Sequence, residues 1–383
     1  MIHLMQPSVG DEELAALSEV FASGWLGHGP RTAAFEAAFA DHVGVPAGQM
    51  IAINCATAGL FLAMQLLEVG AGDEVVLPSI AFLSAANAVA ARGARPVFCD
   101  VDPHTLNPRP ADIEAALGPR TRAVIILHYG GYPGQVAAIA AACRAAGVVL
   151  VEDAACSPAS RVDGRACGTF GDLAVWSFDA TKVLTTGDGG MLYVRDPALA
   201  GKARRLAYHG LTQPSDLARL QTSRRWWEFD LAEFGDRRVG NDLTSAIGLV
   251  QLRRLPELLA RRRQVVERYD RELSQVAGLR LPPPLPSGHE SSYFFYWVQL
   301  PVRIRDAVAG DLYRAGVYTT FKYAPLHRIP AYGWRGRLPG AERAEAETLC
   351  LPLHPNLDET AVKTVVTELR RAIESRLGAP ATG

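Results

Sequence analysis

The sequence predicts an α/β fold in which a large, doubly wound and mostly parallel sheet domain precedes a small C-terminal α+β domain. Short apolar runs alternate with Ala-rich helical stretches from residue 73 to residue 155, which is typical of parallel strands joined by crossover helices. The 383 residues exceed a typical single domain, and 49% hydrophobic content is enough for a sizeable core. We therefore expect a large domain at residues 1–250 and a small one at residues 251–383.

Charge and composition argue against several partners. A net charge of −1 and a pI near 6.8 do not suit nucleic acid or an anionic membrane as the main partner. The first residues lack the basic start of a signal peptide, and no segment approaches roughly 18 uninterrupted apolar residues. We expect a cytoplasmic protein. Its six cysteines are scattered without a Cys-x-x-Cys pair, which predicts reduced thiols and no metal site.

The N-terminal region predicts a helix that a turn ends, and then a strand that leads directly into a second helix. Residues 10–21 carry acidic residues in the first turn of the first helix, and the turn at residues 24–30 ends it. Residues 51–64 form the strand and helix, with small side chains at the junction. Backbone N–H groups at such a helix start bind phosphate, so Ala56 and Thr57 are candidate ligands. An ordinary helix-start residue explains Thr57 about as well.

Alternating strands and helices follow. We expect strands at residues 74–77, 96–99 and 123–128 and helices at residues 85–92 and 113–117. Phe82 follows the first of these strands. A lone phenylalanine in such a place is more often a core residue than a cofactor contact.

The next apolar run, residues 148–153, ends abruptly in two carboxylates. It predicts a buried parallel strand that presents Asp153 at its carboxyl end, the edge at which open α/β sheets bind ligands. A carboxylate there can keep a pyridine nitrogen protonated.

Lys182 lies in the segment 176–190, between predicted strands at residues 173–178 and 191–194. Threonines and glycines follow it, so a ligand could approach the main chain closely. A partly desolvated lysine can act as a nucleophile, as Schiff-base chemistry requires. An isolated lysine in a Gly-rich loop is more often a solvated residue than a catalytic one. Asp153 at the end of a neighbouring strand makes the catalytic role the better interpretation. The pair predicts a pyridoxal phosphate site.

These segments carry a family resemblance. Glu-Asp-Ala-Ala at 152–155 and Ser-Phe-Asp-Ala-Thr-Lys-Val-Leu-Thr-Thr-Gly-Asp-Gly-Gly at 177–190 resemble the motifs of the DegT/DnrJ/EryC1/StrS sugar aminotransferases. These are fold-type I pyridoxal phosphate enzymes. The resemblance extends from Gly24 to Pro355 and implies that Lys182 and Asp153 are the catalytic residues.

The resemblance also implies further cofactor contacts. Phe82 would stack on the pyridine ring, and Ser177 would bind the phosphate together with Ala56 and Thr57. Cys156 stands where the family usually has glutamine, and it could be a small buried residue instead. Arg237 aligns with the residue donated across the dimer interface to the partner's phosphate, with a surface arginine as the alternative. A homodimer with shared active sites is therefore expected.

The C-terminal part begins with a stiff linker at residues 281–288, followed by predicted strands at residues 293–300 and 318–322. The segment Tyr-Ala-Pro-Leu-His at 323–327 resembles the family's substrate entrance. Tyr323 and His327 could bind the substrate there, or they could be a packed tyrosine and a structural histidine.

The implied function is transamination of a nucleotide-linked ketosugar, with L-glutamate as amino donor and the product an aminodeoxysugar for natural-product or surface-glycan synthesis. We prefer a dTDP-4-keto-6-deoxyhexose over a 3-ketosugar as substrate. A sugar dehydratase of the same fold would have histidine in place of Lys182. The motifs would also be compatible with a cofactor-binding regulator that lacks turnover, or with a pyridoxal enzyme that acts on an amino acid.

Overall fold

A seven-stranded mixed sheet forms the centre of the large domain in the computed structural model, which describes residues 1–212 and 227–378. Its strand order is β1-β9-β8-β5-β4-β2-β3. The neighbours from β8 to β3 are parallel, and β9 is antiparallel to both β8 and β1. The strands are β1 (Met50–Ile53), β2 (Glu74–Pro78), β3 (Arg95–Cys99), β4 (Thr121–Leu127), β5 (Val149–Asp153), β8 (Leu173–Ser177) and β9 (Gly190–Val194). The predicted α/β class is confirmed.

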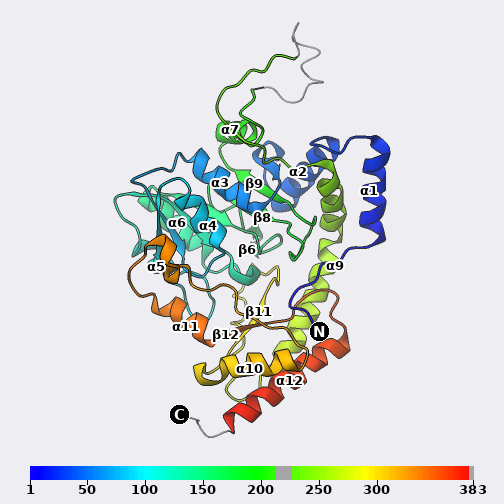
Figure 1. The fold of residues 1–383 in the computed structure, drawn as a ribbon, viewed down its shortest axis with the longest axis vertical. Helices are drawn as coiled ribbons and strands as arrows, with labels where there is room; N and C mark the ends of the chain where they lie inside the picture. The colour runs from blue at the N-terminus through cyan, green and yellow to red at the C-terminus, as the bar shows by residue number, and fades with distance from the viewer. Residues whose placement is uncertain (213–226, 379–383) are drawn as a thin grey trace.

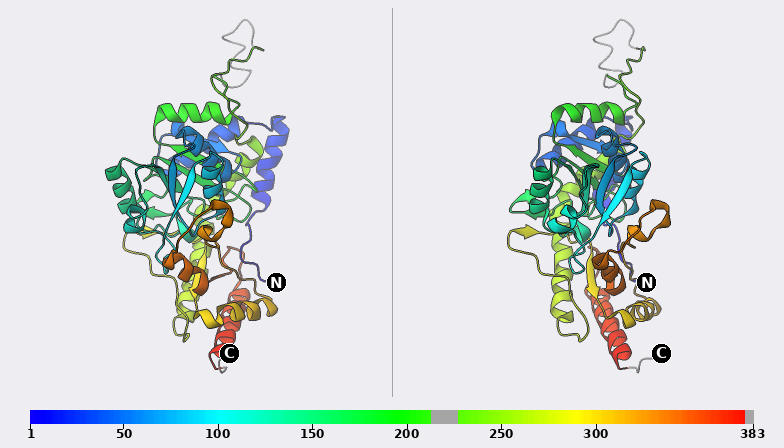
Figure 2. Two further views of the ribbon diagram at one scale, coloured as in Figure 1. Left: turned by 60° about the vertical axis from the view of Figure 1, so that its left-hand side comes forward. Right: turned by 90° about the vertical axis from the view of Figure 1, so that its left-hand side faces the viewer.

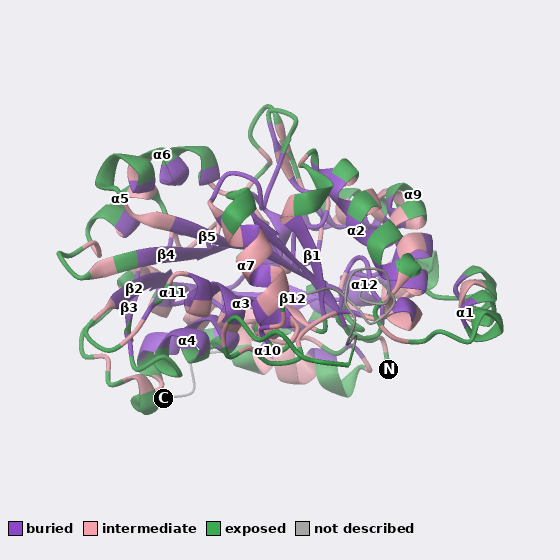
Figure 3. Cartoon of the chain, turned by 90° about the horizontal axis from the view of Figure 1, so that it is seen from above, coloured by how far each residue is buried: buried purple, intermediate pink, exposed green. Residues whose placement is uncertain are grey.

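Helices cover both faces of this sheet (Figure 3). Alternate strand residues enter two different cores: Val75 and Ile125 pack on the α3 side, whereas Val76 and Val124 pack against α5 and α6. This double burial explains why the strands are apolar without alternation. The helices of the large domain are α1 (Asp11–Ser23), α2 (Pro30–Val43), α3 (Ala56–Leu66), α4 (Leu83–Ala90), α5 (Pro110–Glu114), α6 (Val136–Ala146) and α7 (Pro197–Ala207).

The long helix α9 (Asp242–Leu273) connects the large domain to the small one (Figures 1 and 2). Its first half packs on α1 and α2, and its second half contributes Val265, Tyr269 and Leu273 to the core of the small domain. The expected boundary at residue 250 thus lies within this helix. The small domain also contains α10 (Val302–Arg314), β11 (Tyr296–Gln299), α11 (Pro339–Glu347), β12 (Thr348–Leu351) and α12 (Glu359–Leu377).

The smaller elements are the strands β6 (Arg161–Val162), β7 (Arg165–Ala166) and β10 (His289–Glu290), which form a three-stranded sheet, and the 3-10 helices η1 (Ala47–Gln49), η2 (Tyr129–Gly131), η3 (Leu326–Arg328) and η4 (Pro330–Tyr332). Among the described residues, no helix is long and apolar enough to cross a membrane.

The predicted strand at residues 318–322 is wrong. Only Thr320 pairs with the sheet, through a single bridge to Cys350 of β12. The chain then leaves the sheet because the next residues are held elsewhere: the Tyr129 hydroxyl donates to the carbonyl of Lys322, and the Tyr323 ring packs 5.5 Å from that of Phe82. The predicted strand at residues 293–300 is confirmed in part, since β11 covers its second half.

Candidate active site

The candidate site lies where β5 and β8 end side by side. Asp153, the last residue of β5, is in register with Val175 of β8, and the backbone N–H of Ala154 donates to the Val175 carbonyl at 2.9 Å. Lys182 lies in the loop between β8 and β9. The Lys182 N–H donates to Asp179 O at 2.9 Å, and the Thr186 N–H donates to Phe178 O at 2.8 Å. These bonds within the loop fix the position of the lysine backbone.

Asp153 is a buried carboxylate whose charge the protein compensates only in part. Burial raises its pKa above the ordinary value, against the lowering effects of the Ala155 N–H, the Lys182 charge and His128. The Ala155 N–H donates to Oδ1 at 3.1 Å. Within the described residues, Oδ2 accepts no hydrogen bond. This oxygen is therefore available to a ligand.

Lys182 faces an aromatic ring from the start of the small domain. Its Nζ lies 4.5 Å from the ring centroid of Phe294, which is a cation–π distance. Lys322 is a second amine in this neighbourhood. Burial lowers the pKa of Lys322, and the charge of Lys182 lowers it further. The site thus brings two amines near each other, and one of them, Lys182, also acts electrostatically on the buried carboxylate.

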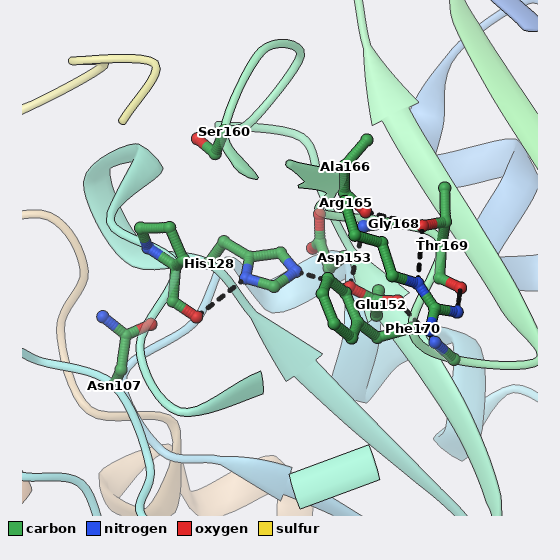
Figure 4. Close-up of polar contacts among 12 residues, drawn as sticks. Asn107, His128, Glu152, Asp153, Ser160, Arg165, Ala166, Gly168, Thr169 and Phe170 are labelled. Atoms are coloured by element: carbon green, nitrogen blue, oxygen red, sulfur yellow. Dashed lines mark hydrogen bonds and ion pairs between the residues drawn. The ribbon is translucent and has the colours of Figure 1, made fainter. Parts of the chain in front are cut away.

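Behind Asp153, a polar network holds the preceding residue, Glu152 (Figure 4). Its Oε2 accepts from Gly168 N–H at 2.7 Å and contacts His128 Nε2 at 2.8 Å, while Oε1 accepts from Gly171 N–H at 2.5 Å. Gly168 has a φ of +94°, and a Cβ there would clash with the ring of Trp176, so this backbone approach requires glycine. Glu152 is therefore fully occupied by the protein.

A candidate phosphate site adjoins the lysine loop. Ala56 and Thr57 begin α3, and the Cys55 Sγ accepts from Ala58 N–H at 3.4 Å as the helix cap. Ser177 is in register with Gly190, where an added Cβ would meet Trp176 O at 2.6 Å and Ala56 N at 3.0 Å. Glycine thus lets the end of β8 and the start of α3 come together. Within the described residues, the N–H groups of Ala56 and Thr57 donate no hydrogen bond.

Phe82 and Tyr323 form an aromatic pair near the carboxylate. Phe82 is 46% exposed although it is apolar, so part of the residue is open to a ligand. Burial raises the pKa of Tyr323, and neighbouring Cys156 and Asp153 add to this shift. Cys156 is buried, which raises its pKa to about 11, and its other electrostatic neighbours include Lys182. These residues therefore gather around the lysine and the carboxylate.

His327 has a different environment from Tyr323. Its Nδ1 lies 2.6 Å from Ser79 Oγ and its Nε2 lies 3.6 Å from Glu342 Oε1, with the side chain only 3% exposed. Burial lowers its pKa, and nearby Arg328 contributes. The ring connects the end of β2 to α11, as a structural histidine would.

Arg237 lies apart from these groups. It is exposed, its guanidinium carbon lies 5.8 Å from the ring centroid of Tyr208, and its backbone forms a bridge with Tyr208. Among the described residues, no hydrogen bond or ion pair joins it to Lys182 or Asp153. The described residues also contain no group of three or more His, Cys, Asp and Glu side chains that could hold a metal.

Comparison with known proteins decides the family. The model of the DegT/DnrJ/EryC1/StrS aminotransferase family matches residues 7–370. This chain belongs to that family.

Two relatives of this aminotransferase cover nearly all of it. It is 56% identical over 377 residues to a dTDP-4-dehydro-2,3,6-trideoxy-D-glucose 4-aminotransferase from Saccharopolyspora spinosa, with 98% of each chain covered. The crystal structure of the aminotransferase TlmJ from Streptoalloteichus hindustanus aligns with a TM-score of 0.94 at 61% identity, covering 98% of this chain and 99% of that one.

A more distant structure is Spr1654 from Streptococcus pneumoniae in its PLP form. It aligns with a TM-score of 0.88 at 25% identity, covering 98% of this chain and 99% of that one. The overall fold thus persists at low sequence identity.

Sequence reasoning missed two residues near the lysine of this aminotransferase, Phe294 and Lys322. Lys322 directly precedes the motif residue Tyr323, so its position was a usable signal. Phe294 offered none, because one phenylalanine in the aromatic run 293–297 looks like any other. Its contact with Lys182 depends on how the small domain packs on the large one.

Proposed function

We propose that this protein is a pyridoxal phosphate-dependent aminotransferase that converts a nucleotide-linked 4-ketosugar to an aminosugar, with L-glutamate as amino donor. The observation that carries the cofactor assignment is the buried Asp153 carboxylate. One of its oxygens accepts no hydrogen bond from the described residues, and the group lies in the electrostatic range of Lys182. A carboxylate left this way suits a protonated ring nitrogen.

The residues present fit the cofactor in kind and position. Ser177 and the free N–H groups of Ala56 and Thr57 would hold the phosphate, which the start of α3 also favours electrostatically. The exposed part of Phe82 would stack on the ring, and Asp153 would bind the ring nitrogen. When bound, pyridoxal phosphate supplies an electron-withdrawing ring and an aldehyde that carries an amino group from donor to acceptor.

Lys182 would bind the aldehyde and, when released, move protons through its Nζ. Phe294 limits the directions in which this amine can move. Cys156 has a raised pKa, so it stays a thiol at neutral pH and can donate a weak hydrogen bond near the ring. Lys322 lies close enough to Lys182 for the charge of Lys182 to lower the pKa of Lys322.

The substrate assignment relies on the Saccharopolyspora spinosa relative, which is named for a dTDP-linked 4-ketosugar and for amination at C4. At 56% identity over 98% of both chains, we infer the same class of substrate here, a dTDP-4-keto-deoxyhexose. Tyr323, at the edge of the site beside Phe82, would contact the sugar. The buried contacts of His327 suit a supporting role instead.

We further propose a homodimer in which Arg237 of one subunit binds the cofactor phosphate of the other. Arg237 lies in a surface segment with exposed apolar side chains, including Leu231 at 51% and Phe234 at 89% exposure. Apolar side chains this exposed mark a contact surface.

All six cysteines are free, which suits the reducing cytoplasm.

The first test compares Lys182→Ala with Lys363→Ala, a control on the exposed surface of α12. Purified wild type and control should show the absorption of bound pyridoxal phosphate, and adding glutamate should shift it. Lys182→Ala should bind the cofactor without the lysine-linked absorption and lose turnover by at least about 10³-fold. Absence of cofactor absorption in wild type, even after pyridoxal phosphate is added, would contradict the proposal.

The second test identifies the substrate. Wild type with glutamate is incubated with dTDP-linked 4-keto and 3-keto deoxyhexoses, and aminosugar formation is followed by mass spectrometry. We expect product from the 4-ketosugars. Product from only the 3-keto isomer would overturn the position of amination, and cofactor binding without any sugar turnover would indicate a regulator.

A further inference from the structure

A cavity of about 380 Å³ lies between α9, the linker at residues 281–285 and β11. Its volume falls within the range of small-molecule sites. Arg263, Glu267 and Asp270 line it from one side of α9, and Leu281 and Leu285 line it from the linker. None of these residues belongs to the proposed cofactor or sugar site.

The lining of this cavity is unusually aromatic. Its aromatic members come from one short stretch and from the end of η2: Tyr132, Tyr293, Phe295, Tyr296 and Trp297. Several of their polar atoms are already used, since Trp297 Nε1 donates to His104 O at 3.1 Å and Tyr132 Oη donates to Pro284 O at 3.4 Å. Trp297 and Tyr132 are only 3% and 8% exposed, so they contribute little polar surface to the cavity.

The charged part of the lining is acidic on balance, with two carboxylates against one guanidinium. The Arg263 guanidinium lies 3.7 Å from Glu267. Asp270 is exposed and has no such cation among the described residues. Its Oδ1 accepts from Tyr296 Oη at 2.7 Å, and its Oδ2 accepts no hydrogen bond from them. Burial raises the pKa of Asp270, and Glu267 adds to this against the lowering effect of Tyr296. A cation here would relieve that cost.

We propose that this cavity binds an organic ammonium ion about the size of a monosaccharide, with its charge at Asp270 and Glu267 and its body against the aromatic rings. Aromatic faces attract ammonium groups, and a carboxylate at the rim adds charge complementarity. An anion would meet two carboxylates, which lie exposed at the cavity, and a neutral ligand would gain nothing from their charge.

The cavity and the reactive lysine share one backbone segment. Tyr293 and Phe295 line the cavity, whereas Phe294 between them packs on Lys182. The N–H groups of Phe294 and Phe295 both donate to Gly130 O, at 2.9 and 3.2 Å, and Gly130 lines the cavity as well. Tyr293 has a left-handed φ of +49°, a strained conformation for a tyrosine. A ligand that displaces Tyr293 or Phe295 would therefore move Phe294 against Lys182.

This connection makes the cavity a regulatory site. The regulatory role rests on the proposed aminotransferase function, whereas binding of the ammonium ion to the cavity does not. The direct product of the reaction still carries the anionic nucleoside diphosphate and does not fit, whereas an amine without that group, formed in a later step, belongs to the chemical class that the cavity selects. The inference thus extends to control of the amination by an amino compound.

The test is calorimetric binding of benzyltrimethylammonium to the holoenzyme, with benzyl alcohol as the neutral comparison. A quaternary ammonium cannot react with the cofactor aldehyde. We expect the cation to bind at least tenfold more tightly than the alcohol. Asp270→Asn should weaken binding of the cation at least fivefold, while Glu257→Gln, an exposed acid on the same helix, should leave it unchanged. Lys182→Ala should also retain binding, which separates this site from the catalytic one.

A second variant tests the site independently, in case Asp270→Asn loses binding only because it folds poorly. Leu285→Trp fills the cavity from the linker side and should abolish binding while circular dichroism stays as in wild type. Saturating cation should change the rate of the glutamate-dependent absorption shift at least twofold in wild type and not in Leu285→Trp. Equal binding of cation and alcohol, no binding, or unchanged binding in both variants would overturn the site. Binding without a rate change would overturn its regulatory role.

Discussion

Two adjacent carboxylates at the end of β5 differ in how many hydrogen bonds they accept from the protein. Glu152 gives both oxygens to protein partners, namely His128 and the N–H groups of Gly168 and Gly171. Among the residues that the structure describes, Asp153 accepts one hydrogen bond, from Ala155, and its other oxygen accepts none. Successive side chains of a strand point to opposite faces, so one strand end can build a structural anchor on one side and a ligand site on the other.

The comparison teaches that burial alone does not identify a functional carboxylate. Both groups are buried, but only at Asp153 do the surrounding groups fail to balance the cost of burying the negative charge. A cationic ring nitrogen would supply the missing positive charge. Mutations at the two positions should accordingly affect different properties, and four measurements test this separation.

The largest expected effect is on catalysis at Asp153. Asp153→Asn removes the negative charge that would hold the ring nitrogen protonated, and we expect turnover of glutamate and ketosugar to fall by roughly 10²- to 10⁴-fold. Asp11→Asn, at an exposed position in α1, is the control and should keep wild-type turnover. A loss of less than about threefold in Asp153→Asn would show that the carboxylate has no such role.

The next effect is on stability at Glu152. Glu152→Gln removes one partner of a buried ion pair, and we expect the free energy of unfolding in urea to fall by about 3 kcal/mol. The exposed Glu114→Gln should change it by less than about 0.5 kcal/mol. If both variants are equally stable, the network around Glu152 does not anchor the strand.

This loss should depend on pH. Burial by itself lowers the pKa of His128, but Cys167 and Glu152 outweigh burial, so the pKa lies above the ordinary value of 6.5. The pairing therefore stabilises the folded state fully below pH 6.5 and weakens as pH rises through the raised pKa. The difference between wild type and Glu152→Gln should be larger at pH 6 than at pH 9, and the opposite trend would contradict a protonated His128.

The smallest effect is on stability at Asp153, and it has the opposite sign. In cofactor-free protein, Asp153→Asn removes a buried, under-compensated charge, so we expect a gain on the order of 0.5–2 kcal/mol near pH 8. Because the folded-state pKa of Asp153 is raised above 3.8, wild type loses stability as pH rises from that value. The gain should therefore shrink as the pH is lowered toward 4. A destabilised Asp153→Asn at pH 8 would show that the ionised group is compensated after all.

The order and type of most elements in the large domain could be predicted from local pattern. The strands at β2, β3 and β4 and the strand-to-helix junction before α3 lie where apolar runs and small residues placed them. The small domain was harder. The segment at residues 318–322 has the composition of a strand, but contacts of Lys322 and Tyr323 with the large domain draw it out of the sheet after one pair.

The sequence by itself determined the parallel sheet, the loop that carries Lys182, the strand end that carries Asp153, and the family, because hydrophobic period and short contiguous motifs encode all of these locally. Only the tertiary structure decided which carboxylate has both oxygens hydrogen-bonded and that Phe294 packs on Lys182. It also decided that His327 contacts Ser79 and that the residues on either side of Phe294 line a separate cavity. These features depend on contacts between residues far apart in the chain, and the free energy of such contacts is set by burial and geometry that no local pattern contains.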